Sequence, residues 1–99
     1  MIVVAAQYVG VPGSASAVRP ALERMATFVQ EREPGCLPFQ VSRALDHPDE
    51  WRLFEVYRDD AAFDAQRSSA HLREILIERI VPLLKRRRPR TYRLVIGTG

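Results

Sequence analysis

Apolar residues at two different spacings divide the first half of the chain into a strand and a helix. Residues 2–9 form an almost continuous apolar run, which is typical of a central strand covered on both faces. Residues 16–33 then repeat apolar side chains every three or four positions, and this spacing predicts a helix. Its buried face should hold Val18, Leu22, Met25 and Val29, and Pro34-Gly35 should end it.

The pattern changes to an alternation of two after this helix. Residues 37–45 alternate between apolar and polar, and residues 51–58 are rich in aromatic and β-branched types. Turn-forming residues at 46–49 separate the two segments, so we expect them to pair as an antiparallel hairpin.

The last third of the sequence predicts two helices and a strand. Asp59 or Asp60 can cap a short helix, and Ser68 or Ser69 can cap a longer one. The buried stripe of the longer helix is expected at Leu72, Leu76, Ile80 and Leu83. Beyond Pro89, which ends any helix, alternating residues predict a fourth strand through Tyr92, Leu94 and Ile96.

The order of elements is β-α-β-β-α-β, which predicts a ferredoxin-like α+β fold with helices on one face of a four-stranded antiparallel sheet. A mass of 11.3 kDa corresponds to about 5,700 Å² of folded surface, which is enough for one modest core. The first strand is apolar on both faces for most of its length, so the sheet face without helices should also be covered. A second copy packed sheet to sheet, in a homodimer, is the simplest cover.

Charge is distributed unevenly along the chain. The net charge is +3 and the isoelectric point is about 9.6, but residues 79–99 carry seven basic side chains and no acidic one. Residues 1–78 hold eight basic and twelve acidic side chains. We interpret the basic segment 85–90 as a helix end whose dipole favours cations, with an anion contact as the alternative. It lacks the interleaved aromatic residues of a single-strand binder, so no nucleic-acid partner is expected.

Cysteine content and hydropathy indicate where the protein works. Cys36 is the only cysteine, so no intrachain disulfide can form, and a buried, unreactive thiol is expected. No apolar run approaches the length of a membrane span, and the N-terminus does not resemble a signal peptide. We therefore expect a cytoplasmic protein without a membrane partner.

The segment from Phe54 to Leu72 resembles the antibiotic biosynthesis monooxygenase (ABM) family in its acidic and aromatic strand end, its alanine-aromatic helix start and its Ser-x-His turn. The junction at 33–37 and the Pro12-Gly13 turn are similar to that family as well, so the resemblance extends over nearly all of residues 1–99, a single ABM-type domain. It implies a dimeric α+β barrel. It also implies a monooxygenase that oxidises quinols, hydroquinones or anthrone-like aromatics with dioxygen and without a cofactor.

Such a reaction needs a base, because a deprotonated phenol is a far better electron donor to dioxygen. His71 is the first candidate, since it matches the histidine of the family's turn; a surface or helix-capping histidine is the alternative. Glu55 is the second candidate, because a carboxylate in mid-strand needs a partner or a raised pKa; a structural ion pair with an arginine is its alternative. Gln66 stands where many members have a second histidine, and an amide can hold a substrate oxygen but cannot take its proton.

Four further residues complete the candidate pocket, which we expect between the sheet and the helices. Trp51, Tyr57 and Phe63 are candidate aromatic walls, with plain core packing as the alternative for each. Gln7 interrupts the apolar first strand and could point into the same pocket or form a hydrogen bond within the sheet.

Two other functions fit the same sequence. Some relatives of this fold bind or degrade haem through a histidine on the second helix, and His71 lies in that region. A dimeric module that binds a metabolite without catalysis is the other. His47 and His71 are far apart and have no further ligands at suitable spacing, so we expect no metal site.

Overall fold

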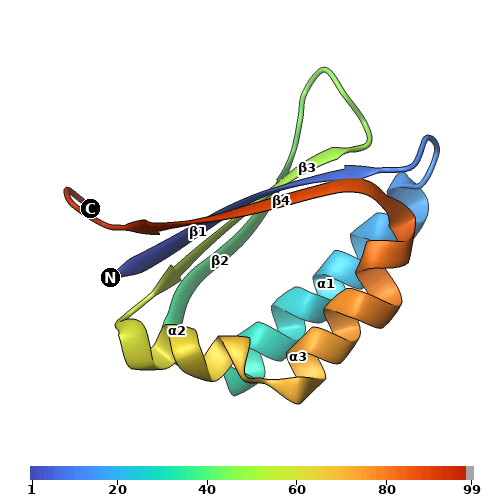
Figure 1. Ribbon diagram of the computed structural model, residues 1–99. Helices are drawn as coiled ribbons and strands as arrows, with labels where there is room; N and C mark the ends of the chain where they lie inside the picture. Colours follow the sequence, from blue (N-terminus) through green and yellow to red (C-terminus); the bar gives the residue numbers. More distant parts are fainter. Residues whose placement is uncertain (98–99) are drawn as a thin grey trace.

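The computed structural model describes residues 1–97, which form a four-stranded antiparallel sheet with all helices on one face (Figure 1). The strands lie in the order β2-β3-β1-β4, so β3 and β1 are central. The ferredoxin-like α+β prediction is confirmed. The elements are β1 (Ile2–Gly10), α1 (Ala15–Arg32), β2 (Cys36–Arg43), β3 (Glu50–Tyr57), α2 (Asp60–Arg67), α3 (Ala70–Glu74), the π-helix η1 (Ile75–Ile80), the 3₁₀-helix η2 (Val81–Leu83) and β4 (Leu84–Arg93).

The pairing of β1 with β3 determines which side chains face the helices. Ala6 lies opposite Leu53 and Tyr8 opposite Trp51, and all four belong to the main core. Because side chains alternate across a strand, the odd-numbered residues of β1 point to the open face. This open face carries no helix, and the connection between β2 and β3 rises on its side (Figure 1).

The predicted buried face of α1 is confirmed. Val18, Leu22, Met25 and Val29 are all buried, and they pack against the helix-facing side chains of the sheet. Ser14 is the residue at the N-cap of this helix, but its hydroxyl forms no capping hydrogen bond. Burial of the apolar stripe therefore holds this helix in place without help from a side-chain cap.

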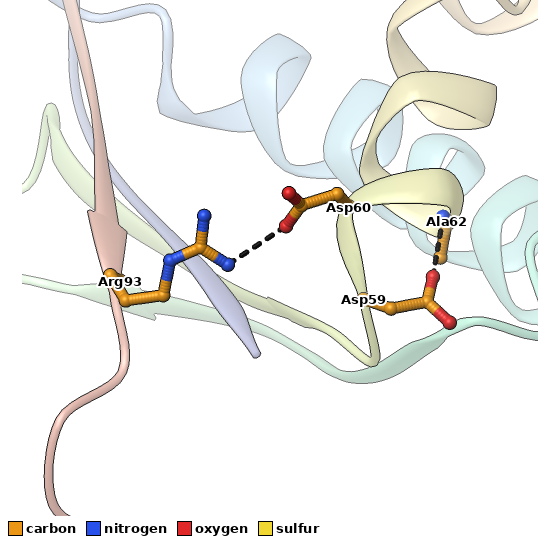
Figure 2. Close-up of polar contacts among 4 residues, drawn as sticks. All are labelled: Asp59, Asp60, Ala62 and Arg93. Carbon is orange, nitrogen blue, oxygen red and sulfur yellow. Dashed lines mark hydrogen bonds and ion pairs between the residues drawn. The ribbon is translucent and has the colours of Figure 1, made fainter.

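Two caps define where α2 and α3 begin. The Asp59 carboxylate accepts a hydrogen bond of 2.8 Å from the backbone N–H of Ala62 (Figure 2), and the Ser69 hydroxyl accepts one of 3.3 Å from that of Leu72. Both caps are among those the sequence predicts. Beyond α3 the helix widens into η1, a local geometry that apolar spacing does not reveal.

The position of the last strand differs from the prediction. β4 runs from Leu84 to Arg93, whereas the sequence pattern placed it through Tyr92, Leu94 and Ile96. Pairing with β1 decides the outcome, because every residue from Ile2 to Val9 has a partner between Arg86 and Arg93. β4 is an edge strand, and edge strands tolerate charged residues and proline. The basic segment 85–90 is consequently a strand, and its interpretation as a helix end was wrong.

No helix in the described residues combines the length and the hydropathy needed to cross a bilayer.

Candidate functional site

A cavity of about 480 Å³ lies between the helix-facing side of the sheet and the helices α2, α3 and η1. Its volume falls within the range of small-molecule sites. Its walls come from seven elements, so it exists only in the folded chain. The lining residues are Val4, Tyr8, Met25, Leu53, Glu55, Phe63, Gln66, Arg67, Leu72, Arg73, Leu76, Ile77, Arg87, Pro89 and Thr91.

Glu55 is the only carboxylate in the lining of this cavity. It is 7% exposed, and Tyr57, two residues further along β3, donates a hydrogen bond of 3.0 Å from its hydroxyl to Oε1 of Glu55. Burial raises the pKa of Glu55, because a low-dielectric setting disfavours the charged form. The hydrogen bond from Tyr57 and the positive charge of Arg87 act in the opposite direction. A carboxyl group with a raised pKa suits proton transfer near neutral pH.

Tyr57 forms a hydrogen bond with Glu55 but does not line the cavity itself. Its side chain is fully buried, and its ring meets that of Phe63 edge to face at 5.5 Å between centroids. Burial, together with the neighbouring carboxylate, raises the pKa of Tyr57, so its hydroxyl remains a hydrogen-bond donor. Phe63 does line the cavity, and it brings an aromatic wall from α2.

Basic and aromatic side chains are paired at the border of the cavity. The guanidinium carbon of Arg67 lies 5.3 Å from the ring centroid of Phe63, and that of Arg87 lies 5.6 Å from the ring centroid of Tyr8. Arg87 also donates a hydrogen bond of 3.2 Å from Nε to the Tyr8 hydroxyl. Burial raises the pKa of Tyr8, although Arg87 counteracts this. Arg73 supplies a third guanidinium group from α3.

The candidate residues proposed from sequence are divided by the fold. Glu55, Phe63 and Gln66 line one cavity, and Tyr57 contacts two of them. The remaining three candidates, His71, Trp51 and Gln7, lie elsewhere.

His71 is exposed and lies in a groove of about 560 Å³ between α1 and the continuous segment formed by α3 and η1. Its ring centroid is 6.2 Å from that of Phe28. The helical periodicity explains this position, because Leu72 takes the buried direction and its neighbour in sequence points away. The lining of this groove is mostly charged, with three glutamates and two arginines beside the apolar side chains of Phe28 and Ile75.

Trp51 and Gln7 are separated from Glu55 by position on the sheet. Trp51 faces the helices but lines a different groove, beside α1 and β2, where the guanidinium carbon of Arg43 lies 5.5 Å from its ring centroid. Gln7 is half-buried on the open face, since it alternates with Ala6 and Tyr8. Neither side chain lines the cavity beside Glu55.

Tyr8, Arg67, Arg73 and Arg87 are cavity residues that the sequence analysis did not select. Tyr8 could have been found, because it follows Val4 at an even spacing along β1. Arg87 was not selected because residues 85–90 were expected to end a helix. Only in a strand do alternate residues point to opposite faces, so the helix interpretation gave no reason to place Arg87 on the helix-facing side of the sheet.

Cys36 and His47 lie outside the cavity beside Glu55 and are not candidate reactive residues. Burial raises the pKa of the half-buried Cys36 thiol to about 11, which keeps it protonated near neutral pH. His47 is exposed in the turn before β3, where its Nδ1 accepts a hydrogen bond of 3.3 Å from the backbone N–H of Asp49. No cluster of three or more potential metal ligands occurs in the described part of the chain.

Comparison with known proteins places this chain in a family. The family model of the antibiotic biosynthesis monooxygenases (ABM) matches residues 1–76, which extend from β1 into η1. The protein therefore belongs to the ABM family. No curated protein sequence matches the chain.

Solved structures show the same fold over the whole chain. Rv0793 from Mycobacterium tuberculosis is 27% identical, with a TM-score of 0.85 over 99% of this chain and 98% of that one. Protein SO0527 from Shewanella oneidensis is 25% identical, with a TM-score of 0.85 over 97% and 92% of the two chains. A structure described as an antibiotic biosynthesis monooxygenase is 21% identical, with a TM-score of 0.83 over 97% and 100%.

Proposed function

We propose that this protein is a cofactor-independent monooxygenase that oxidises a quinol, hydroquinone or anthrone-like aromatic with dioxygen in the cavity beside Glu55. The observation that carries this proposal is a buried carboxylate, held by Tyr57, facing a cavity with aromatic walls and cationic side chains. Membership of the ABM family supports the reaction class.

Glu55 acts as the base in this proposal. It removes a proton from the substrate hydroxyl or from an acidic C–H, and the resulting anion gives an electron to dioxygen far more readily than the neutral molecule does. For an anthrone, the CH₂ group becomes a carbonyl that keeps one oxygen atom, and the second oxygen atom leaves as water with the two hydrogens. Arg87 stabilises negative charge on the substrate, because its guanidinium group borders the same cavity.

Oxygen uptake by metal-free protein tests the proposal on a panel of hydroquinones and anthrones. Glu55→Gln keeps the shape and the acceptor oxygen but removes the base, so we expect kcat to fall by about 10²- to 10⁴-fold. His71→Gln serves as the matched control and should leave kcat unchanged, because His71 lies in the other groove. Turnover of no compound would refute the activity, and full activity in Glu55→Gln would refute the role of Glu55.

The protein is further proposed to work as a homodimer whose subunits meet through the open face of the sheet. Phe54 and Tyr92 point to that face, opposite Ala5 and Val3 of β1, and they are 41% and 43% exposed. The accessible surface of the chain is 6606 Å², about 900 Å² more than the scaling law gives for a monomer of this mass. That excess is similar to the area of about 800 Å² that one partner buries in a standard interface.

Light scattering after size-exclusion chromatography tests the dimer. Phe54→Asp places a charge at the centre of the open face, so it should convert the dimer to a monomer. Gln30→Glu is the matched control, because it adds a negative charge at an exposed position of α1, on the opposite side of the sheet. A monomeric wild-type protein, or a dimer that survives Phe54→Asp, would overturn this arrangement.

A further inference from the structure

Cationic side chains predominate around the proposed substrate cavity. Its lining contains one carboxylate, that of Glu55, and the three guanidinium groups of Arg67, Arg73 and Arg87. None of the three arginines forms an ion pair with an acidic side chain among residues 1–97. Arg87 acts on the charge of Glu55, but a neutral hydroquinone would leave the guanidinium groups of Arg67 and Arg73 without an anionic partner.

Two of these arginines are held in position before any ligand binds. Arg67 lies over the ring of Phe63 on α2, and Arg87 lies over the ring of Tyr8 and donates a hydrogen bond to its hydroxyl. Packing against an aromatic face restricts the guanidinium group, so less entropy is lost when it pairs with an anion. Such an arrangement suits recognition of a carboxylate, which can accept two parallel hydrogen bonds from one guanidinium group.

We infer that the substrate carries an anionic group, in the simplest case a carboxylate, which Arg67 binds while the hydroxyl to be deprotonated faces Glu55 and Arg87. The inference rests on the proposed function in taking this cavity as the substrate site. Arg87 already acts on the charge of Glu55, so Arg67 is the guanidinium group left for a second anion.

A pair of probes that differ only in charge tests this inference. 2,5-Dihydroxyphenylacetate and its methyl ester have the same ring and the same hydroxyl groups, and only the acid is anionic at neutral pH. Isothermal titration calorimetry without oxygen measures binding alone. A charge-assisted pair contributes about 1.5–3 kcal/mol, so the acid should bind at least about ten-fold more tightly than the ester.

Arginine variants locate the source of this preference. Arg67→Gln should reduce the preference for the acid by about five-fold or more, with the affinity for the ester unchanged. Arg32→Gln is the matched control, because Arg32 also lies over a phenylalanine ring, at 5.8 Å from the centroid of Phe28, but outside the cavity. Arg67 is an exposed residue on α2, so Arg67→Gln should leave the core intact.

The outcomes separate this inference from the proposed function. Equal binding of acid and ester by the wild-type protein, no binding of the acid, or an equal loss in Arg32→Gln would overturn the anionic substrate. Oxygen uptake with the same two probes is measured independently. Preferred binding of the acid without turnover of any compound would leave the inference standing and refute the monooxygenase, whereas equal binding and turnover of both probes would do the reverse.

Discussion

Removing one hydroxyl group at the centre of the site should have a pH-dependent effect on stability. Tyr57→Phe deletes the donor of the 3.0 Å hydrogen bond to Glu55 and leaves the fully buried ring in place. A hydrogen bond to a charged group contributes about 1.5–3 kcal/mol, and one between neutral groups about 0.5–1.5 kcal/mol. We therefore expect the free energy of unfolding to fall by about 1.5–3 kcal/mol where Glu55 is ionised, and by roughly 1 kcal/mol where it is protonated.

The sign of this dependence follows from the pKa of Glu55, which burial raises above the ordinary value of 4.5. Between these two pKa values the folded protein binds more protons than the unfolded chain, so the contribution of Glu55 to stability declines as pH rises. The bond from Tyr57 lowers the pKa of Glu55, and its loss therefore raises that pKa further and steepens the decline. The destabilisation by Tyr57→Phe should grow with increasing pH.

Urea unfolding followed by circular dichroism, at one protein concentration and at about pH 4.5 and pH 8, measures this effect. The same substitution in a Glu55→Gln background should cost about 1 kcal/mol or less at both pH values, because the charged acceptor is gone. Thr27→Val is the control for loss of an exposed hydroxyl group, on α1, and should change stability by less than about 0.5 kcal/mol. An equal loss at both pH values, with no coupling to Glu55, would refute the reasoning.

Three further predictions concern the core, the cap of α2 and the thiol. Leu53→Ala should lower the free energy of unfolding by about 2–5 kcal/mol in the same urea assay, because Leu53 is 1% exposed. Leu45→Ala should change it by less than about 0.5 kcal/mol, because Leu45 is fully exposed. Asp59→Ala should lower the free energy of unfolding by about 1 kcal/mol, because the cap of α2 is lost. Arg93→Gln should lower it by less, because the ion pair between Arg93 and Asp60 of α2 is exposed (Figure 2). The opposite order of the two variants in thermal unfolding would contradict this. Cys36 in the folded protein should react with iodoacetamide at neutral pH about 100-fold more slowly than a thiol of pKa 9. Mass spectrometry measures the rate of this reaction. Equal rates before and after unfolding would exclude the raised pKa.

Local spacing was sufficient to predict most of the elements. The buried stripe of α1, the hairpin of β2 and β3, and the caps at Asp59 and Ser69 all depend on residues a few positions apart. Such patterns predict structure because burial repeats with the period of the element. The position of Glu55 in the middle of a strand is local information of the same kind, and it made this carboxylate a candidate.

The sequence by itself therefore determined the order of the elements and the buried side of most of them, including the carboxylate on β3. Only the tertiary structure decided that β4 begins at Leu84, because pairing with β1 determines where an edge strand lies. That pairing brings Arg87 to the cavity, whereas the orientation of α3 places His71 in the other groove. The composition of the site depends on contacts between residues far apart in the chain, and no periodicity records those contacts.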